Sequence, residues 1–417
     1  MPKRNSKRIL AERVGGLQSE RDRIEATETL GRAFNDPGGM ERHVQRSLWQ
    51  GVMYNPEHTR VTVAGGRVAA AVVMAPRMIR FGPVKVPAMT VGPVGTHDHY
   101  RKKGCAAAAM NDASRHMKEN GVLLAYLGGI ENFYYRFGYY PCLTPSSVKF
   151  QREAARKEAS PGRLRAMTKK DIPAVSKLHA EVTANRLCAA ARDRELWQWL
   201  LGPGGRSWLF QKPKLILDRR GRLCGYLTLR PRTDFAISEI VVRQDEASCR
   251  ATLGALVHEA RRRELKEISF RVPWDDHTAV FLRQFVPAEF TIWSNPTGGQ
   301  LMKVVDFVAL MMRLQPLFDL RWKSASAVLP STSFRFECEL GAVQVGLTRR
   351  QVTIGPARSG GQKVRVPLRW LSGLLTGHYA PQDIALRKGA HIPSALRPGM
   401  DVLFPKEWAF IYQGDNY

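Results

Sequence analysis

A cluster of three cations precedes a helix-forming stretch in the first third of the chain. The residues Arg101, Lys102, Lys103 and Gly104 are followed by Cys105-Ala106-Ala107-Ala108-Ala109. The first backbone N–H groups of a helix lack internal partners, and the helix dipole adds partial positive charge there. Glycine and small side chains let a ligand approach these groups closely. Such a turn suits a pyrophosphate. An alanine-rich helix with an exposed basic start is the plainer alternative.

The segments around this turn predict the elements that position it. An apolar, β-branched run with Thr90, Val91 and Val94 precedes the turn and predicts a strand. A helix follows and ends at Asn120-Gly121, after which residues 122–127 predict a second strand. Strand, turn, helix and strand together form one βαβ unit.

Two motifs in this region resemble those of the GCN5-related N-acetyltransferase (GNAT) superfamily. The pattern Arg101-x-x-Gly104-x-Ala106 is similar to its acyl-CoA signature, although Asp98 stands where that signature commonly has a proline. The run Tyr134-Tyr135-Arg136-Phe137-Gly138-Tyr139 resembles the enhanced intracellular survival (Eis-like) branch. That resemblance implies two tandem acetyltransferase-like domains followed by a sterol-carrier-like domain.

The resemblance also implies catalytic roles. Acetyl transfer to an amine needs a base for the ammonium and an acid for the leaving thiolate. By the motif, Tyr134 is the proton donor, with Tyr135 as the alternative, and a tyrosine keeps its proton at neutral pH. Packing aromatics on a short helix are the plainer interpretation of both. In the resembled family the terminal carboxylate is the base; here it belongs to Tyr417, in an aromatic tail, residues 408–417, that we expect to pack. A tail that packs only for stability is the alternative.

Contacts to acetyl-CoA follow from the same resemblance. They come from the edge of the first strand, the turn and the end of the second strand: Val94, Gly95, Thr96, Arg101, Lys102, Lys103, Gly104, Cys105, Ala106, Ala107, Gly129 and Ile130. Two diverging parallel strands expose backbone groups that bind the pantetheine arm and polarise the thioester oxygen. No metal is expected, because the pair His97 and His99 lacks a third ligand.

Composition excludes several other classes. The chain has 417 residues, 44% hydrophobic and 24% charged, as globular proteins have. A polar N-terminus and the lack of a long apolar run predict a cytoplasmic protein. Six cysteines without a CxxC pair indicate neither a disulfide framework nor a zinc knuckle. The net charge of +27 would attract the phosphates of CoA, and also nucleic acid or an anionic membrane.

Patterns along the chain predict three units, residues 1–150, 160–300 and 304–417. The expected fold class is therefore α+β, with two tandem acetyltransferase-like mixed-sheet domains and a sterol-carrier-protein-like α+β domain. The second unit repeats the order of the first, but Arg243-Gln244-Asp245-Glu246 replaces the basic turn, so we expect one CoA per chain. In the third unit, residues 304–314 predict a helix that Pro316 ends.

The sequence thus predicts an acetyl-CoA-dependent N-acetyltransferase that acts on a primary amine, such as an aminoglycoside, a polyamine or a lysine side chain. A homo-oligomer, a hexamer by resemblance, is expected. A carrier of lipid or another hydrophobic ligand built on the C-terminal unit is one alternative, and a charge-driven nucleic-acid binder is another. A cationic amine would need an acidic pocket, which the sequence does not locate.

Overall fold

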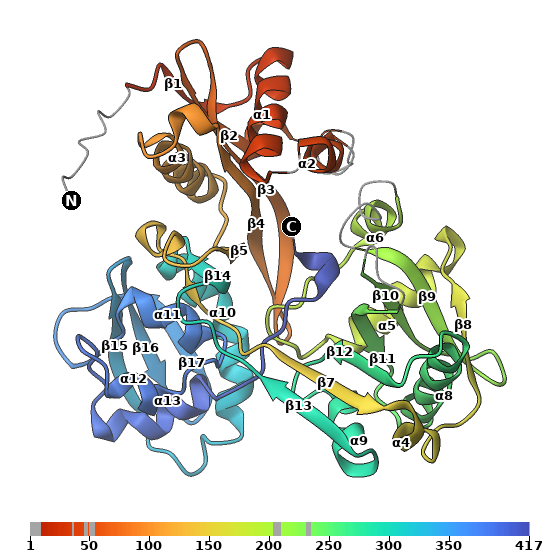
Figure 1. Ribbon diagram of the computed structural model, residues 1–417. Helices are drawn as coiled ribbons and strands as arrows, with labels where there is room; N and C mark the ends of the chain where they lie inside the picture. Colours follow the sequence, from red (N-terminus) through yellow and green to blue (C-terminus); the bar gives the residue numbers. More distant parts are fainter. Residues whose placement is uncertain are drawn as a thin grey trace, which may run out of the picture.

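The computed structural model describes residues 10–35, 37–45, 49, 55–202, 210–230 and 235–416. It confirms the α+β class, because mixed and antiparallel sheets carry helices on their faces. Figure 1 shows three units, the first at the top, the second at the right and the third at the lower left. Among the helices of these residues, none is both long and apolar enough to cross a bilayer.

The first unit is built on a mixed sheet with the strand order β1-β2-β3-β4-β5-β14-β6. Only β4 and β5 are parallel neighbours in it. The strands are β1 (Arg13–Gly16), β2 (Thr59–Ala64), β3 (Arg67–Phe81), β4 (Val84–Thr96), β5 (Leu124–Gly129), β6 (Tyr140–Pro141) and β14 (Gly299–Val304). Its helices are α1 (Glu20–Ala33), α2 (Pro37–Val44) and α3 (Cys105–Glu119), with short 3-10 helices η2 (Pro56–His58), η3 (Asp98–Tyr100) and η4 (Tyr134–Phe137).

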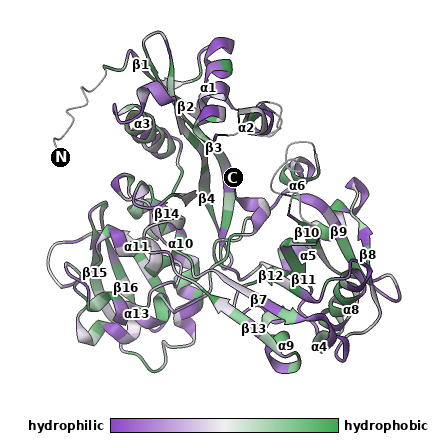
Figure 2. Ribbon diagram, viewed as in Figure 1, coloured by the Kyte–Doolittle hydropathy of each residue, from purple (hydrophilic) through white to green (hydrophobic). Residues whose placement is uncertain are grey.

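Helices cover both faces of this sheet, which explains why β3 is apolar on both sides. Ala71 and Val73 share a core with residues of α1, whereas Val72 and Met74 share one with residues of α3. Successive strand residues point to opposite faces, so this alternation places α1 and α3 on opposite sides of β3. Figure 2 shows β3 as largely hydrophobic. Strands β2, β3 and β4 form an antiparallel meander that leads into α3 and β5.

The second unit repeats the element order of the first. Its antiparallel sheet has the order β11-β10-β9-β8, and a second sheet has the order β12-β7-β13. The strands are β7 (Ser146–Gln151), β8 (Gly162–Ala166), β9 (Gln211–Asp218), β10 (Leu223–Leu229), β11 (Ile237–Val242), β12 (Glu267–Arg271) and β13 (Ala288–Ile292). The helices are α4 (Arg152–Arg156), η5 (Lys169–Asp171), α5 (Ile172–Val182), α6 (Arg194–Leu201), α8 (Glu246–Arg262) and α9 (His277–Phe285).

The first two units exchange one strand each. In chain order β7 follows β6 of the first unit, yet it lies between β12 and β13 of the second. Conversely, β14 follows β13, yet it lies between β5 and β6 of the first. Each unit therefore completes its sheet with a strand from the chain segment of the other. We retain 1–150, 160–300 and 304–417 as a proposal for the sequence limits of the units.

The third unit contains a four-stranded sheet of order β17-β16-β15-β18, in which β15 and β18 are parallel. Its strands are β15 (Thr332–Cys338), β16 (Gly341–Leu347), β17 (Val352–Pro356) and β18 (Gln362–Arg365). Its helices are α10 (Phe307–Lys323), α11 (Leu368–Leu375), α12 (Pro381–Ala385), η6 (Ser394–Leu396) and α13 (Arg397–Leu403), and the short η7 (Gln413–Asp415) follows in the tail.

The prediction that Pro316 ends the first helix of this unit is wrong, because α10 continues through it to Lys323. A proline inside a helix removes a hydrogen bond and costs about 3 kcal/mol. Beyond it, Leu317, Phe318 and Trp322 are all buried in the core of the third unit. Burial of three large apolar side chains offsets the cost.

The C-terminal tail leaves the third unit and runs back to the other two. Ala409, Ile411 and Tyr412 are buried, and the backbone N–H of Phe410 donates to the carbonyl of Leu187 at 3.0 Å. Figure 1 shows this dark blue segment between the first and second units. As predicted from its composition, the tail packs.

Candidate active site

The basic turn shapes the start of α3 so that its backbone donors stay available. Gly104 is the N-cap residue with φ of 93°, and Lys102 has φ of 63°. The hydroxyl of Thr62 donates to the carbonyl of Cys105 at 2.9 Å, which fixes the helix start against β2. An N-cap glycine has no side chain that could accept from the first N–H groups of the helix. These groups are therefore free to bind an anion.

The cations of the turn surround this helix start. Arg101 is half-exposed and pairs with Asp98 at 2.8 Å, so the residue that replaces the expected proline neutralises part of its charge. The ammonium of Lys103 lies 5.7 Å from the centroid of the Tyr100 ring. The turn thus presents positive charge next to backbone donors, which is the combination that a diphosphate needs.

The parallel strands β4 and β5 are paired over a short stretch and then diverge. Their register covers Ala88↔Leu124, Met89↔Ala125 and Thr90↔Tyr126. Within residues 84–129, all of which the structure describes, β4 continues to Thr96 and β5 to Gly129 without further pairing between them. The facing edges beyond Thr90 therefore expose backbone groups to a gap.

The structure brings the predicted acetyl-CoA contacts to this end of the sheet. Val94, Gly95 and Thr96 lie on the diverging end of β4, which pairs with β3 along its other edge. A Cβ at Gly95 would lie 2.9 Å from the Cβ of Ala33, so glycine allows α1 to pack closely. Gly129 ends β5, and the following residue, Ile130, is exposed.

Tyr134 lies at the end of β5, on η4. Its side chain is buried, in the same core as Met89 and Val91 of β4. A Cβ at Gly129 would lie 2.9 Å from its ring carbon Cδ2, so the ring packs directly on that glycine. Burial raises the pKa of Tyr134 to about 12, which keeps its proton on at neutral pH.

Tyr135 has different surroundings. Its ring stacks on Tyr140 with centroids 5.5 Å apart and planes 21° apart. Burial raises the pKa of Tyr135, and the positive charge of Arg369 on α11 offsets part of this rise. The phenol of Tyr135 therefore lies near the third unit. Of the two tyrosines that the sequence left open, Tyr134 is the one packed against the end of β5.

Lys303 holds η4 in place, and sequence reasoning missed it. This residue of β14 donates from Nζ to the hydroxyl of Ser114 on α3 and to the carbonyl of Phe137 on η4, both at 2.8 Å. Burial lowers the pKa of Lys303 to about 8. The lysine comes from the exchanged strand, so no local pattern in the sequence connects it with the tyrosine helix.

The proposed base, Tyr417, lies outside the described residues. The residues before it reach the gap, because the Tyr126 hydroxyl of β5 donates to the carbonyl of Asp415 at 2.8 Å. Gln300 of β14 donates from Nε2 to the side-chain oxygen of Asn416 at 3.1 Å.

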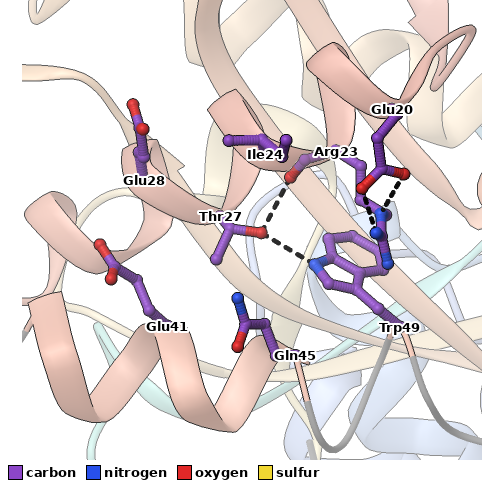
Figure 3. A pocket seen from close by; sticks show the side chains of 8 residues that line it. All are labelled: Glu20, Arg23, Ile24, Thr27, Glu28, Glu41, Gln45 and Trp49. Atoms are coloured by element: carbon purple, nitrogen blue, oxygen red, sulfur yellow. Dashed lines mark hydrogen bonds and ion pairs between the residues drawn. The ribbon is translucent and has the colours of Figure 1, made fainter.

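A hollow of about 420 Å³ between α1 and α2 is lined by carboxylates, and sequence reasoning did not find it (Figure 3). Glu20 pairs with Arg23 in it, Glu28 pairs with Arg67 at 3.5 Å, and Glu41 has no ion-pair partner among the residues that the structure describes. Ile24, Thr27, Gln45 and Trp49 complete the lining. In the sequence, acidic residues on both sides of the Pro-Gly-Gly run at residues 37–39 are the signal that could have located this hollow.

Within the described residues, no group of three or more His, Cys, Asp or Glu side chains is arranged to hold a metal ion. In the predicted His97 and His99 pair, the backbone N–H of His99 donates to the Nδ1 of His97 at 3.3 Å.

Comparison with known proteins assigns the class of the first unit. Residues 17–142 match the family model described as Acetyltransferase (GNAT) domain, and no curated protein matches the chain. The chain therefore contains a GNAT acetyltransferase domain, and it is an N-acetyltransferase of the kind that uses acyl-CoA.

Solved structures extend the likeness to nearly the whole chain. A GCN5-related N-acetyltransferase from Anabaena variabilis has a TM-score of 0.75 at 15% identity, with 97% of this chain and 100% of that chain covered. A probable N-acyltransferase from Enterococcus faecalis has 0.75 at 14%, covering 97% and 99%. Eis1 from Mycobacterium abscessus has 0.65 at 16%, covering 97% and 100%. At these identities the likeness is one of fold.

Proposed function

We propose that this protein moves an acetyl group from acetyl-CoA to a primary amine, with Tyr134 as general acid and the carboxylate of Tyr417 as general base. One observation carries the proposal. The uncapped, basic start of α3 and the diverging ends of β4 and β5 lie at the same end of one βαβ unit, with Tyr134 packed on the last residue of β5.

In this proposal the diphosphate of CoA binds the first N–H groups of α3, from Cys105 to Ala107, with Arg101, Lys102 and Lys103 around it. The pantetheine arm follows the diverging edge of β4, at residues 94–96. Backbone N–H groups on that edge donate to the thioester oxygen and stabilise the negative charge that develops on it. Gly129 and Ile130 line the opposite side.

The amine attacks the thioester carbon, and the C–S bond then breaks. The Tyr417 carboxylate takes one proton from the ammonium before the attack, and the sulfur takes the proton of Tyr134 as the C–S bond breaks. The nitrogen loses its second proton as the amide forms, and this proton restores the phenol of Tyr134. A thiol has a pKa of about 8.5, below that of the buried phenol. Tyr134 therefore stabilises the charge on the sulfur by donating a hydrogen bond, and the transfer of its proton is completed because the proton lost by the nitrogen replaces it.

The hollow between α1 and α2 supports a cationic acceptor. In a chain of net charge +27, Glu41 supplies local negative charge on α2, which with α1 forms, by family resemblance, a wall of the acceptor pocket. Glu41→Gln should raise the KM for the amine about threefold and leave that for acetyl-CoA unchanged, since a partly screened charge contributes about 1 kcal/mol or less. An unchanged amine KM would remove this hollow from the proposal.

The test of the activity has two parts. Isothermal titration with acetyl-CoA should give heat with one site per chain, and a panel of aminoglycosides, polyamines and lysine peptides should be screened by release of the CoA thiol. An absence of binding heat at micromolar protein contradicts the proposal, as does binding without thiol release on the whole panel.

A further inference from the structure

A fully buried ionic cluster joins the second unit to the tail. Arg192 stands between Glu239 of β11 and Asp415 of the tail, and the side chains of all three are completely buried. Its two terminal nitrogens donate to the Glu239 oxygens at 2.8 and 2.9 Å, and its Nε donates to Oδ1 of Asp415 at 2.7 Å. The hydroxyl of Tyr226 donates to Glu239 at 2.8 Å.

Further bonds fix two consecutive tail residues. Asp415 accepts from the backbone N–H of Ala190 through Oδ2 at 3.3 Å and from the Tyr126 hydroxyl through its carbonyl at 2.8 Å. The N–H of Gly414 donates to Glu239 at 2.8 Å. A Cβ at Gly414 would lie 2.8 Å from a terminal nitrogen of Arg192, so glycine is required for this approach.

Stability alone is a weak reason for such a cluster. Removing ions from water is costly, and replacing a buried ion pair by apolar side chains is often neutral or stabilising. The tail already buries Ala409, Ile411 and Tyr412. Apolar contact is non-directional, however, so these side chains alone would tolerate a shift of the tail along its own direction. Hydrogen bonds with defined geometry from three chain segments tolerate no such shift.

The cluster lies where β4 and β5 part. Tyr126, which holds the Asp415 carbonyl, is the last residue of β5 that pairs with β4. The next tail residue, Asn416, contacts Gln300, which pairs with Gly128, two residues further along β5. From Asp415 to Asn416 the tail therefore advances along β5 toward the end on which Tyr134 packs.

We propose that Arg192 and Asp415 are positioning residues that hold the chain end at the gap between β4 and β5. The second unit, through Arg192 and Glu239, then sets the geometry of the site in the first unit. This inference rests on the proposed function, in which the terminal carboxylate is the base.

The first experiment uses the full chain with Asp415→Asn, and Glu407→Gln as the matched control. Glu407 directly precedes the tail and pairs with Arg321 of the third unit at 2.6 Å. We expect kcat to fall about 10- to 100-fold in Asp415→Asn, since misplacing a reacting group by about 1 Å can cost this much. The KM and Kd of acetyl-CoA should stay unchanged, and the control should keep its kcat. A wild-type kcat in Asp415→Asn overturns the inference.

A second measurement does not depend on activity. Carboxypeptidase A removes C-terminal aromatic residues, so its rate of tyrosine release reports how firmly the chain end is held. Release should be about tenfold faster in Asp415→Asn than in wild type and Glu407→Gln, because local opening precedes cleavage. Equal rates overturn the inference, even for a protein in which no turnover is found. If Asp415→Asn fails to fold, Tyr126→Phe, which removes one hydroxyl, should show the same changes to a smaller extent.

A double variant separates positioning from general structure. In a chain that ends at Asn416, Asp415→Asn should cause no further loss of kcat, because the group that it positions is gone. An additional loss of the same factor overturns the inference. If removal of Tyr417 alone leaves kcat unchanged, the proposed base is wrong. If the wild type neither binds acetyl-CoA nor releases thiol, the proposed function is wrong.

Discussion

The first two units share an order of elements and differ at the start of one helix. In the first unit α3 begins at Gly104, which has no side chain to offer to the helix donors. In the second, α8 begins after Asp245, whose carboxylate accepts from the N–H of Ser248 at 2.7 Å and from its hydroxyl at 2.9 Å. The start of α3 has no side-chain cap, whereas α8 caps the N–H of Ser248 with a carboxylate that also places negative charge there. In the proposed function, a single capping residue thus separates an anion site from a stable helix start.

A second difference concerns the strands that flank these helices. In the first unit β4 and β5 pair and then diverge, and Tyr134 follows β5. In the second, β11 and β12 belong to different sheets, and residues 272–285 after β12 contain no tyrosine. Glu239 of β11 binds the tail instead. The second unit therefore holds the tail that reaches the first unit.

Replacing the tyrosine would remove the clearest difference between the two units. Tyr134→Phe should lower kcat by about 10²- to 10³-fold, because the leaving sulfur loses its proton donor. The Kd of acetyl-CoA should not change. Tyr135→Phe is the matched control and should keep its turnover, since that ring stacks on Tyr140. Steady-state thiol release decides between them, and equal losses in both variants would argue against the assignment of Tyr134.

Displacing the chain end tests the contribution of the tail to the first unit. One glycine added after Tyr417 should reduce turnover about 100-fold, because the carboxylate moves away from the amine that it deprotonates. Binding of acetyl-CoA, measured by titration, should remain. Wild-type turnover of the extended chain would exclude the terminal carboxylate as the base.

Changing the turn tests whether one unit alone binds the cofactor. Gly104→Ala should weaken acetyl-CoA binding roughly tenfold, because a φ of 93° costs an alanine about 1–2 kcal/mol and the turn must rearrange. Gly121→Ala, at φ of 69° after the same helix, is the control for stability and should bind normally. Titration calorimetry should give one site per chain in wild type. Two sites would contradict the difference drawn between α3 and α8.

The smallest effect concerns Asp98, which pairs with Arg101. Asp98→Asn should tighten acetyl-CoA binding about two- to threefold at low salt, since an exposed ion pair is worth about 1 kcal/mol or less. The gain should shrink at 0.5 M salt because of screening, with a Debye length of roughly 4 Å. Weaker binding in Asp98→Asn would show that the carboxylate orders the turn rather than competing with the phosphates.

Local features of the sequence were sufficient for much of the fold. The apolar run before α8 predicts the strand from Ile237 to Val242, and the run from Leu223 to Leu229 predicts β10. Short apolar runs bounded by turn residues favour strands whatever elements pack against them. The turn at Gly104 was also predictable, since it depends on residues next to each other in the chain. Pro316 shows the limit of such rules, because distant packing partners outweigh its local cost.

The sequence by itself determined which residues we propose for binding a diphosphate and donating a proton, since side-chain chemistry and helix capping act over a few neighbouring residues. Only the tertiary structure decided how those groups are supported. Three features join segments that are far apart in the chain: the exchange of β7 and β14, the lysine that holds η4, and the cluster of Arg192, Glu239 and Asp415. In that cluster, Arg192 and Asp415 are 223 residues apart. Burial makes these contacts specific, and burial depends on the whole chain being folded.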